Sequence, residues 1–250
     1  LVDTAHHGET LLANMEALGV APGDIDAVML SHGHYDHTGG LEDLLCSAPS
    51  PLPVFAHPHA FAPKLSFGTK PRDTSSPVDA PRITALGGRL HEYTEPFSLL
   101  PELVFLGEIP RTHSREEEAR RGMYTTQDGR YGPDLLLDDT SLALRLEGGG
   151  LFLVCGCCHS GLINTVEHAM SVTGENRLAG VIGGLHTIHA GQERMRFTLE
   201  KLREYAPKVL FPLHCAGVEE TAVLFREPGA SVRFLSAGDT IDVDEACGQE

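Results

Sequence analysis

The sequence predicts an α/β fold, in which short apolar strands end in glycine-containing loops that lead into helices. Two segments show this order clearly. The apolar run 27–30 precedes the histidine-rich loop 31–40, and the run 151–154 precedes a loop, 155–161, with three cysteines and a histidine. A short apolar run is typical of a buried strand, and glycine releases the chain from it. Because functional groups belong at the carboxyl ends of such strands, we expect both loops to carry chemistry.

Bulk composition narrows the class of protein. A chain of 250 residues can bury a full core, and its net charge of −16 argues against a nucleic-acid-binding surface. An anionic substrate stays possible, because bound cations would dominate the local field.

The six cysteines lack the spacing of a disulfide framework, which favours a reducing compartment. With no visible signal peptide and no apolar run of about 18 residues, we expect a cytoplasmic protein that acts on a small molecule, without a membrane or nucleic-acid partner. The sequence does not indicate an oligomeric state.

The first half contains recognisable helices and strands between irregular segments. Apolar residues at helical spacing predict a helix over Gly8 to Leu18, and a second helix is expected over Leu41 to Cys46. A short strand is expected over 53–56, followed by a loop or flap over 63–82 and by strand-like pieces between 82 and 106. The charged run 114–121 predicts a solvated helix, and the chain through 139 is expected to be irregular.

The second half repeats the alternation of strands and helices. We expect strands over 141–146, 151–154, 178–182 and 208–212, and helices over 162–172 and 192–205. Strands over 232–235 and 240–243 would finish the sheet. Because no linker separates two globular segments and no repeat of fixed period occurs, the sequence predicts a single domain over residues 1–250.

The loop after the first motif strand has the composition of a metal site. His32, His34, Asp36 and His37 stand within six positions, and imidazole and carboxylate groups are ligands for zinc, manganese or iron. In extended backbone, alternate side chains share one side, so His32, His34 and Asp36 are expected to converge while His37 points elsewhere. One loop could therefore supply ligands to two adjacent metals.

This His-x-His-x-Asp-His motif after a strand resembles the signature of the metallo-β-lactamase superfamily of binuclear hydrolases. The resemblance continues along most of the chain, in the segments 1–4, 107–111, 156–161, 183–186 and 213–215. Their order resembles one branch, the 7,8-dihydropterin-6-methyl-4-(β-D-ribofuranosyl)-aminobenzene-5′-phosphate synthase-like proteins. The resemblance implies an αββα sandwich, with two mixed sheets packed face to face and helices outside. It also implies that N-terminal strands of the relatives are missing here, because the chain starts inside a core strand.

The resemblance implies two divalent metal ions, zinc first, with manganese or iron as alternatives. The ligands expected from it are the four residues of the loop together with two strand-end histidines: His32, His34, Asp36, His37, His159 and His214. Many members have a bridging aspartate near His159, where this chain has cysteine and histidine, so the bridging ligand stays open.

Other residues of these segments are candidates for catalysis or substrate binding. His186 is either a ligand or a proton donor, and Asp36 can also orient the nucleophile. The substrate-binding candidates are Glu108, Arg111, Cys157 and Ser160. Arg111 suits an anionic group, whereas Cys157 is either a thiolate ligand or, as buried cysteines usually are, inert.

The predicted function is metal-dependent hydrolysis of a small anionic substrate, at a phosphoester or related bond. Two adjacent metals would share a water and lower its pKa, so that hydroxide is available at neutral pH. A first alternative is the synthase-type activity of the branch. Further alternatives are an iron-based oxidoreductase and a non-catalytic metal-binding protein on the same scaffold.

Overall fold

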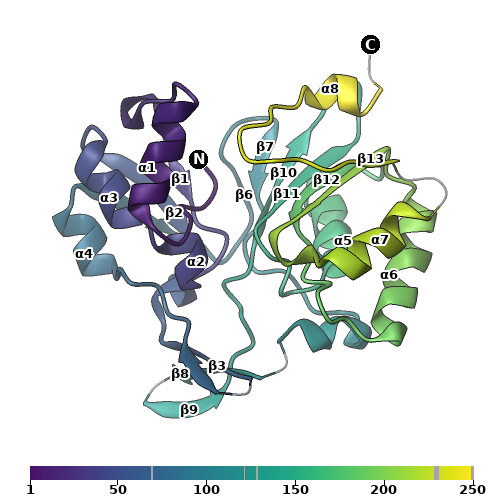
Figure 1. Cartoon of the computed structure of the whole chain (residues 1–250), viewed down its shortest axis with the longest axis horizontal. Helices are drawn as coiled ribbons and strands as arrows, with labels where there is room; N and C mark the ends of the chain where they lie inside the picture. The colour runs from purple at the N-terminus through teal and green to yellow at the C-terminus, as the bar shows by residue number, and fades with distance from the viewer. Residues whose placement is uncertain (69, 121, 128, 228–230, 249–250) are drawn as a thin grey trace. The chain divides into compact units, whose positions relative to one another are not determined.

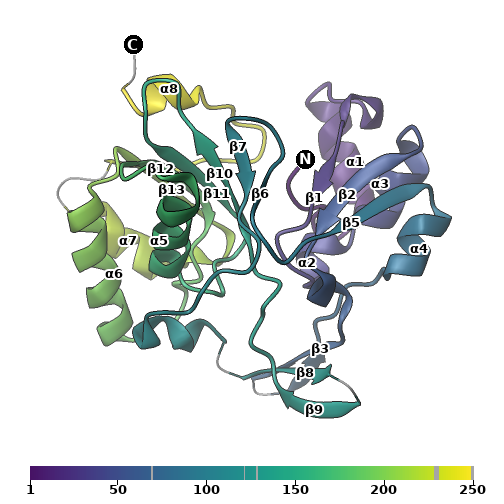
Figure 2. The same cartoon turned by 180° about the vertical axis from the view of Figure 1, so that it is seen from behind.

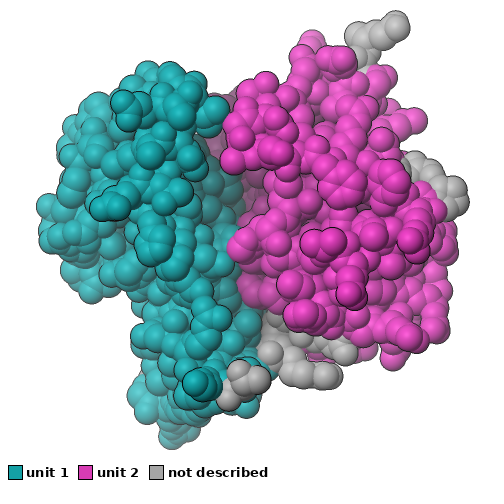
Figure 3. Space-filling model, viewed as in Figure 1, with its two compact units in different colours: residues 1–94, 122–138 teal, residues 95–121, 139–250 magenta. Residues whose placement is uncertain are grey.

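The computed structural model (Figures 1 and 2) describes the chain except residues 69, 121, 128, 228–230 and 249–250, and except the side chains at 118–120 and 127. The chain divides into two compact units, coloured separately in Figure 3. The first unit comprises Leu1–Thr94 and Gly122–Asp138, and the second comprises Glu95–Arg121 and Asp139–Glu250. The assignment of residues 1–250 to a single domain stays a prediction. None of the helices among the described residues is long and apolar enough to cross a membrane.

A small parallel sheet with helices on one face forms the centre of the first unit (Figures 1 and 2). Its strand order is β1-β2-β5, with β1 at Val28–Met29, β2 at Leu52–Ala56 and β5 at Gly88–Glu92. The helices of this unit are α1 (Gly8–Ala17), α2 (Tyr35–Thr38), α3 (Leu41–Ser47) and α4 (Ala80–Ala85), with 3₁₀ turns η1 (Pro22–Asp24) and η2 (Pro58–Phe61). Buried side chains such as Met15, Val28, Leu44, Val54 and Ile83 join helices and strands in one apolar cluster.

The first unit also contains an antiparallel sheet that the sequence did not predict. Its order is β4-β3-β8-β9, with β3 at Lys64–Phe67, β4 at Pro71–Asp73, β8 at Met123–Gln127 and β9 at Arg130–Pro133. The expected loop at 63–82 is therefore wrong over β3, β4 and the start of α4, and the expected irregular chain before 139 is wrong over β8 and β9. Residues 74–79 and 134–139 are irregular as expected, and positions 69 and 128 lie outside the described residues. Pairing of β3 with β8 joins segments far apart in the sequence, so no local pattern predicts it. The pairing of β8 with β9 is local, and the Asp128-Gly129 dipeptide between these strands is a hairpin signal that the sequence analysis missed.

A seven-stranded mixed sheet forms the second unit. Its order is β14-β13-β12-β11-β10-β7-β6, and the four strands from β14 to β11 are parallel. The strands are β6 (Phe97–Ser98), β7 (Leu103–Phe105), β10 (Ser141–Arg145), β11 (Leu151–Cys155), β12 (Leu178–Gly184), β13 (Val209–Leu213) and β14 (Ser231–Val232). The parallel strands end at one edge of the sheet, which is where the second set of predicted site residues follows.

Helices cover the faces of this sheet. Figures 1 and 2 show α5 (Leu162–Thr173), α6 (Gln192–Tyr205) and α7 (Val218–Phe225) on one face. Their side chains pack with alternate strand residues such as Leu153 and Leu210. The strand residues between them, including Phe152 and Phe211, have side chains on the opposite face and pack with the short helix α8 (Val243–Ala246). The period of two in these strands thus places one apolar set on each face.

Most predicted elements of regular periodicity are confirmed. The helices expected at 8–18, 41–46, 162–172 and 192–205 are α1, α3, α5 and α6, and the strands expected at 53–56, 141–146, 151–154, 178–182 and 208–212 are β2, β10, β11, β12 and β13.

The expected C-terminal strands are largely wrong. Only Ser231–Val232 forms a strand, and no described residue of 233–242 does. Asp239 accepts a hydrogen bond from the Ser236 N–H at 2.7 Å, which closes a turn. Asp242 accepts one from the Glu245 N–H at 3.0 Å and so caps α8. Local side-chain hydrogen bonds therefore replace the strand pairing here.

The charged run at 114–121 is also different from its prediction. Ser114–Arg120 forms the 3₁₀ helix η3, residue 121 lies outside the described residues, and the Glu116 side chain is buried. Its carboxylate accepts the N–H groups of Ile163 and Asn164, at 3.0 and 2.8 Å. These donors belong to the first turn of α5, where the helix offers no carbonyl partner. Burial raises the pKa of Glu116.

We predict that Glu116→Ala destabilises the second unit by about 1–3 kcal/mol, because two buried N–H groups lose their acceptor. Glu117→Ala is the matched control, since the Glu117 side chain is exposed in the same turn. Urea unfolding of both variants measures the difference. Equal unfolding midpoints would contradict the capping role of Glu116.

Candidate metal centre

The loop after β1 brings two imidazole nitrogens together within the first unit. His32 Nε2 and His34 Nδ1 lie 2.9 Å apart. Two nitrogen ligands at about 2.0–2.1 Å from one tetrahedral zinc would lie about 3.3 Å apart. The backbone is extended at His34, so the two side chains share one side as alternation predicts. The donor atoms and their spacing fit a shared metal ion.

The prediction for Asp36 and His37 was wrong in its geometry. Extended backbone ends at His34, and Tyr35–Thr38 forms the short helix α2. Asp36 and His37 consequently form their own pair, with Asp36 Oδ2 at 3.9 Å from His37 Nε2. The motif thus offers two donor pairs, one of two imidazoles and one of a carboxylate and an imidazole. The pairs are adjacent, because the ring centroids of His32 and His37 lie 4.2 Å apart, and His37 therefore does not point elsewhere as expected.

Asp3 holds both pairs through one carboxylate. Its Oδ2 lies 2.6 Å from His37 Nδ1 and accepts a hydrogen bond from the Ser31 hydroxyl at 2.8 Å, while its Oδ1 accepts the Ser31 N–H at 2.7 Å. The Ser31 hydroxyl in turn lies 3.0 Å from His32 Nδ1. A carboxylate on the outer nitrogen of a ligating histidine fixes the tautomer and the ring orientation. Asp3 also has a left-handed backbone, with φ of 57°, which indicates a constrained position.

A buried ion pair supports the same loop from the other side. Asp138 accepts the Gly33 N–H at 2.7 Å and pairs with Lys64 Nζ at 2.8 Å. Gly33 must be glycine, because a Cβ there would lie 1.8 Å from the carbonyl oxygen of Ala60. Burial, together with the charge of Lys64, lowers the pKa of His34 to about 4. His34 is therefore neutral at pH 7, which is the form that can ligate a metal.

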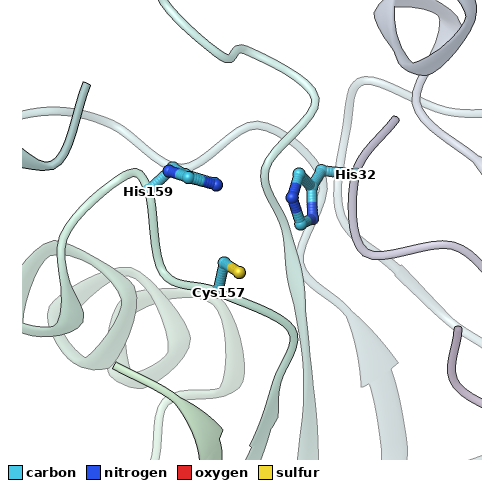
Figure 4. A group of neighbouring side chains, drawn as sticks. All are labelled: His32, Cys157 and His159. Carbon is cyan, nitrogen blue, oxygen red and sulfur yellow. The ribbon is translucent and has the colours of Figure 1, made fainter. Parts of the chain in front are cut away.

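The second unit presents its candidates at the carboxyl ends of three neighbouring parallel strands. His159 follows β11, His186 follows β12 and His214 follows β13. The ring centroids of His159 and His186 lie 4.2 Å apart. Figure 4 shows Cys157 and His159 on the turn after β11, and His32 on its own loop of the first unit. Within the second unit, the predicted strand-end placement of these histidines is confirmed.

The turns that carry these side chains have an unusual backbone. Cys158, His186 and His214 all adopt left-handed conformations, with φ of 57°, 44° and 50°. Residues other than glycine rarely do so, and such strain concentrates at functional sites. The left-handed backbone of these three turns therefore indicates a functional site.

Two thiols join this edge of the sheet. Cys215 Sγ lies 3.4 Å from Cys157 Sγ and accepts the His186 N–H at 3.3 Å. The hydrogen bond between the sulfur atoms is the main cause that lowers the pKa of Cys215 to about 4, against the effect of burial, and His186 contributes. Cys157 is thus buried next to a second thiol, and its role as a thiolate ligand stays a prediction beside the inert alternative.

The remaining substrate-binding candidates have mostly structural contacts. Asp139 Oδ2 accepts the Ser160 N–H at 2.8 Å, and the Ser160 hydroxyl donates to the Asp139 carbonyl at 3.3 Å. Burial raises the pKa of Asp139. Arg111 donates to the Ile109 carbonyl at 2.7 Å within its own turn, and Glu108 is half-buried next to that turn.

Sequence reasoning missed the roles of Asp3, Asp139, Cys215 and Arg194. Asp3 and Cys215 stand in segments that carried the family resemblance, so that signal could have found them. Asp139 and Arg194 have no local motif. Arg194 is buried in α6 and donates to the His186 carbonyl at 2.6 Å, a contact between elements that spacing does not reveal.

We predict that Asp3→Asn weakens zinc binding by about 10- to 100-fold, because the ligand histidines lose the carboxylate that orients them. Competition with a chromophoric chelator measures the affinity. Asp26→Asn, on the exposed surface of the same unit, should leave it unchanged. Equal affinities for wild type and Asp3→Asn would contradict the positioning role.

Comparison with known proteins agrees with this geometry. Residues 1–103 match the family model described as metallo-beta-lactamase superfamily. The chain is 35% identical to the 7,8-dihydropterin-6-methyl-4-(beta-D-ribofuranosyl)-aminobenzene-5′-phosphate synthase of Methanocaldococcus jannaschii, over 96% of this chain and 83% of the relative. An uncharacterized protein of the same organism is 27% identical over 87% of this chain and 78% of its own length.

A solved structure is similar in fold. The crystal structure of a metal-dependent hydrolase of the beta-lactamase superfamily matches with a TM-score of 0.80 at 23% identity, covering 96% of this chain and 87% of the other. This likeness confirms the predicted fold class. The resemblance to the synthase branch is confirmed by the relative that is 35% identical. The chain therefore belongs to the metallo-beta-lactamase superfamily.

Proposed function

We propose that the protein is a metal-dependent enzyme that hydrolyses a phosphoester or related bond in a small anionic substrate. The observation that carries the proposal is the pair of nitrogens, His32 Nε2 and His34 Nδ1, held 2.9 Å apart on a loop organised by Asp3. Two divalent ions, zinc first, would be held by the six predicted ligands: His32, His34, Asp36, His37, His159 and His214. Membership of the superfamily supports this ligand set.

Divalent ions in such a site supply charge stabilisation and a water of lowered pKa. The chain's own residues supply the rest. In this proposal, Asp36 accepts a proton from the attacking water and orients it, and His186 holds the proton that the leaving group requires. Asp3 keeps His37 in one tautomer. The six cysteines are all free, which supports a reducing compartment such as the cytoplasm.

A second candidate is synthesis of a pterin-containing phosphate, the activity in the name of the M. jannaschii relative. The identity of 35% supports it as strongly as the fold supports hydrolysis. A cavity of about 800 Å³ in the second unit is a further support. It lies next to His214 and is lined by apolar side chains that include Phe225, Phe234 and Ile188. Such a lining suits a flat aromatic ring better than a small phosphate.

One assay separates the candidates. Protein stripped by a chelator is reloaded with zinc, manganese or iron and is offered phosphoesters, a lactone and a thioester, and separately the precursors of the relative's product. We expect hydrolysis of a phosphoester to return on reloading and to fall at least about 100-fold in the double variant His32→Ala/His34→Ala. His91→Ala on β5 is the histidine control and should retain activity.

The outcomes are distinct. Formation of the pterin product without hydrolysis of the panel would favour the second candidate. Activity that persists after complete removal of metal, or in the double variant, would contradict metal-dependent chemistry at this loop. A metal-loaded, folded protein without either activity would contradict both candidates.

A further inference from the structure

The second unit contains a cluster of soft ligands that the proposed metal centre does not use as a group. Cys157, His186 and Cys215 each stand two residues beyond the end of a strand, because β11 ends at Cys155, β12 at Gly184 and β13 at Leu213. The three strands are parallel neighbours, with β12 in the middle. Equal offsets from adjacent parallel strands bring side chains to one place at the sheet edge.

The donor atoms are close enough for one ion. One ligand atom from each of the three residues lies within 4.8 Å of the other two, and the sulfur atoms are 3.4 Å apart. Two thiolates at about 2.3 Å from a tetrahedral zinc would be separated by about 3.8 Å. A shift of a few tenths of an ångström therefore brings both sulfurs to ligand distance.

A glycine and a backbone N–H group next to the three ligands favour a metal site. At Gly184 a Cβ would lie 2.8 Å from Cys215 Sγ and 3.0 Å from the Cys157 Cα, so glycine lets the two cysteines approach across β12. The His186 N–H donates to Cys215 Sγ at 3.3 Å. Backbone N–H groups on a sulfur are typical of the surroundings of a metal thiolate.

Arg194 fixes the turn that carries the imidazole. Its side chain is buried and donates to the carbonyls of His186 and Leu185, at 2.6 and 3.5 Å. These bonds run from α6 to the left-handed residue His186 and hold its backbone in place. The backbone that carries the imidazole is therefore fixed by a contact from α6.

We propose that Cys157, Cys215 and His186 form a separate binding site for one thiophilic divalent cation, such as zinc or cadmium. All three ligands belong to the second unit. Ligand atoms of His159 and of His214 also lie within 4.8 Å of the one in Cys157, so Cys215 and His186 are the ligands that distinguish this site from the proposed metal centre. Thiolate and imidazole ligands select zinc and cadmium over magnesium or calcium. On binding, the thiol protons leave to solvent and the ion takes their place.

The site has a regulatory consequence, which rests on the proposed function. If His186 holds the proton for the leaving group, an ion bound to its imidazole removes that proton carrier. Excess zinc should then inhibit the enzyme that a lower amount of zinc activates. The Cys215→Ser variant, which keeps His186, should be less sensitive to excess zinc.

Cobalt absorption provides a readout that does not depend on enzyme activity. A sulfur-to-cobalt charge-transfer band in the near ultraviolet appears only when a thiolate binds the ion, so the band reports ligation by cysteine. The reduced double variant His32→Ala/His34→Ala, which lacks the first imidazole pair, is titrated with cobalt. We expect the band to appear in this double variant. When a further substitution is added to it, the band should weaken with Cys215→Ser or His186→Ala and should persist with Cys46→Ser. Cys46 is exposed in the first unit and is the matched control.

A second measurement uses the unmutated protein. Cadmium should protect Cys157 and Cys215, but not Cys46, from alkylation, with each peptide quantified by mass spectrometry. A band that vanishes in the His32→Ala/His34→Ala background would overturn a separate site, because Cys157 would then serve the histidine loop. Absence of the band and of cadmium protection in folded, reduced protein would overturn the site altogether. Neither result would bear on hydrolysis, which the reloading assay tests.

Discussion

The Asp3 carboxylate is the contact on which the histidine loop depends. It accepts the N–H and the hydroxyl of Ser31, and it lies at 2.6 Å from His37 Nδ1. Through Ser31 it reaches His32, so a single side chain orients one imidazole of each donor pair. The left-handed backbone of Asp3 is the local strain that accompanies this position. Because charge-assisted hydrogen bonds are strong in buried surroundings, the loop is pre-organised before any metal binds.

Both units follow the same constraint, which is that side chains with chemistry follow the carboxyl ends of parallel strands. In the first unit this is the loop after β1, and in the second it is the three turns after β11, β12 and β13. Glycines at the tightest points, Gly33 and Gly184, let backbone and side chains approach where a Cβ would collide. Buried polar groups such as Glu116 and Asp138 then satisfy the N–H groups that these turns leave without partners.

The sequence predicts much of this because the predictive signals are local. The periodicity of α5 and α6 and the apolar runs of β11 and β12 need no knowledge of distant contacts. The antiparallel sheet of β3 and β8, the buried role of Glu116 and the C-terminal turns depend on pairings between distant segments or on side-chain hydrogen bonds. The four candidate ligands of the motif were identified from composition. Their division into two pairs was not, because it depends on the start of α2 directly after His34. Asp139 and Arg194 act through tertiary contacts and leave no motif.

The central claim is that the loop after β1 binds metal through His32 and His34. Its most direct test is the metal content per chain, by elemental mass spectrometry, of protein purified without chelator. The account predicts about two divalent ions per chain at the histidine ligands, with a third where Cys157 and Cys215 also bind one. It also predicts a clear loss in the His32→Ala/His34→Ala variant. A folded wild type that neither retains nor takes up a divalent ion would contradict it, as would equal metal content in the variant.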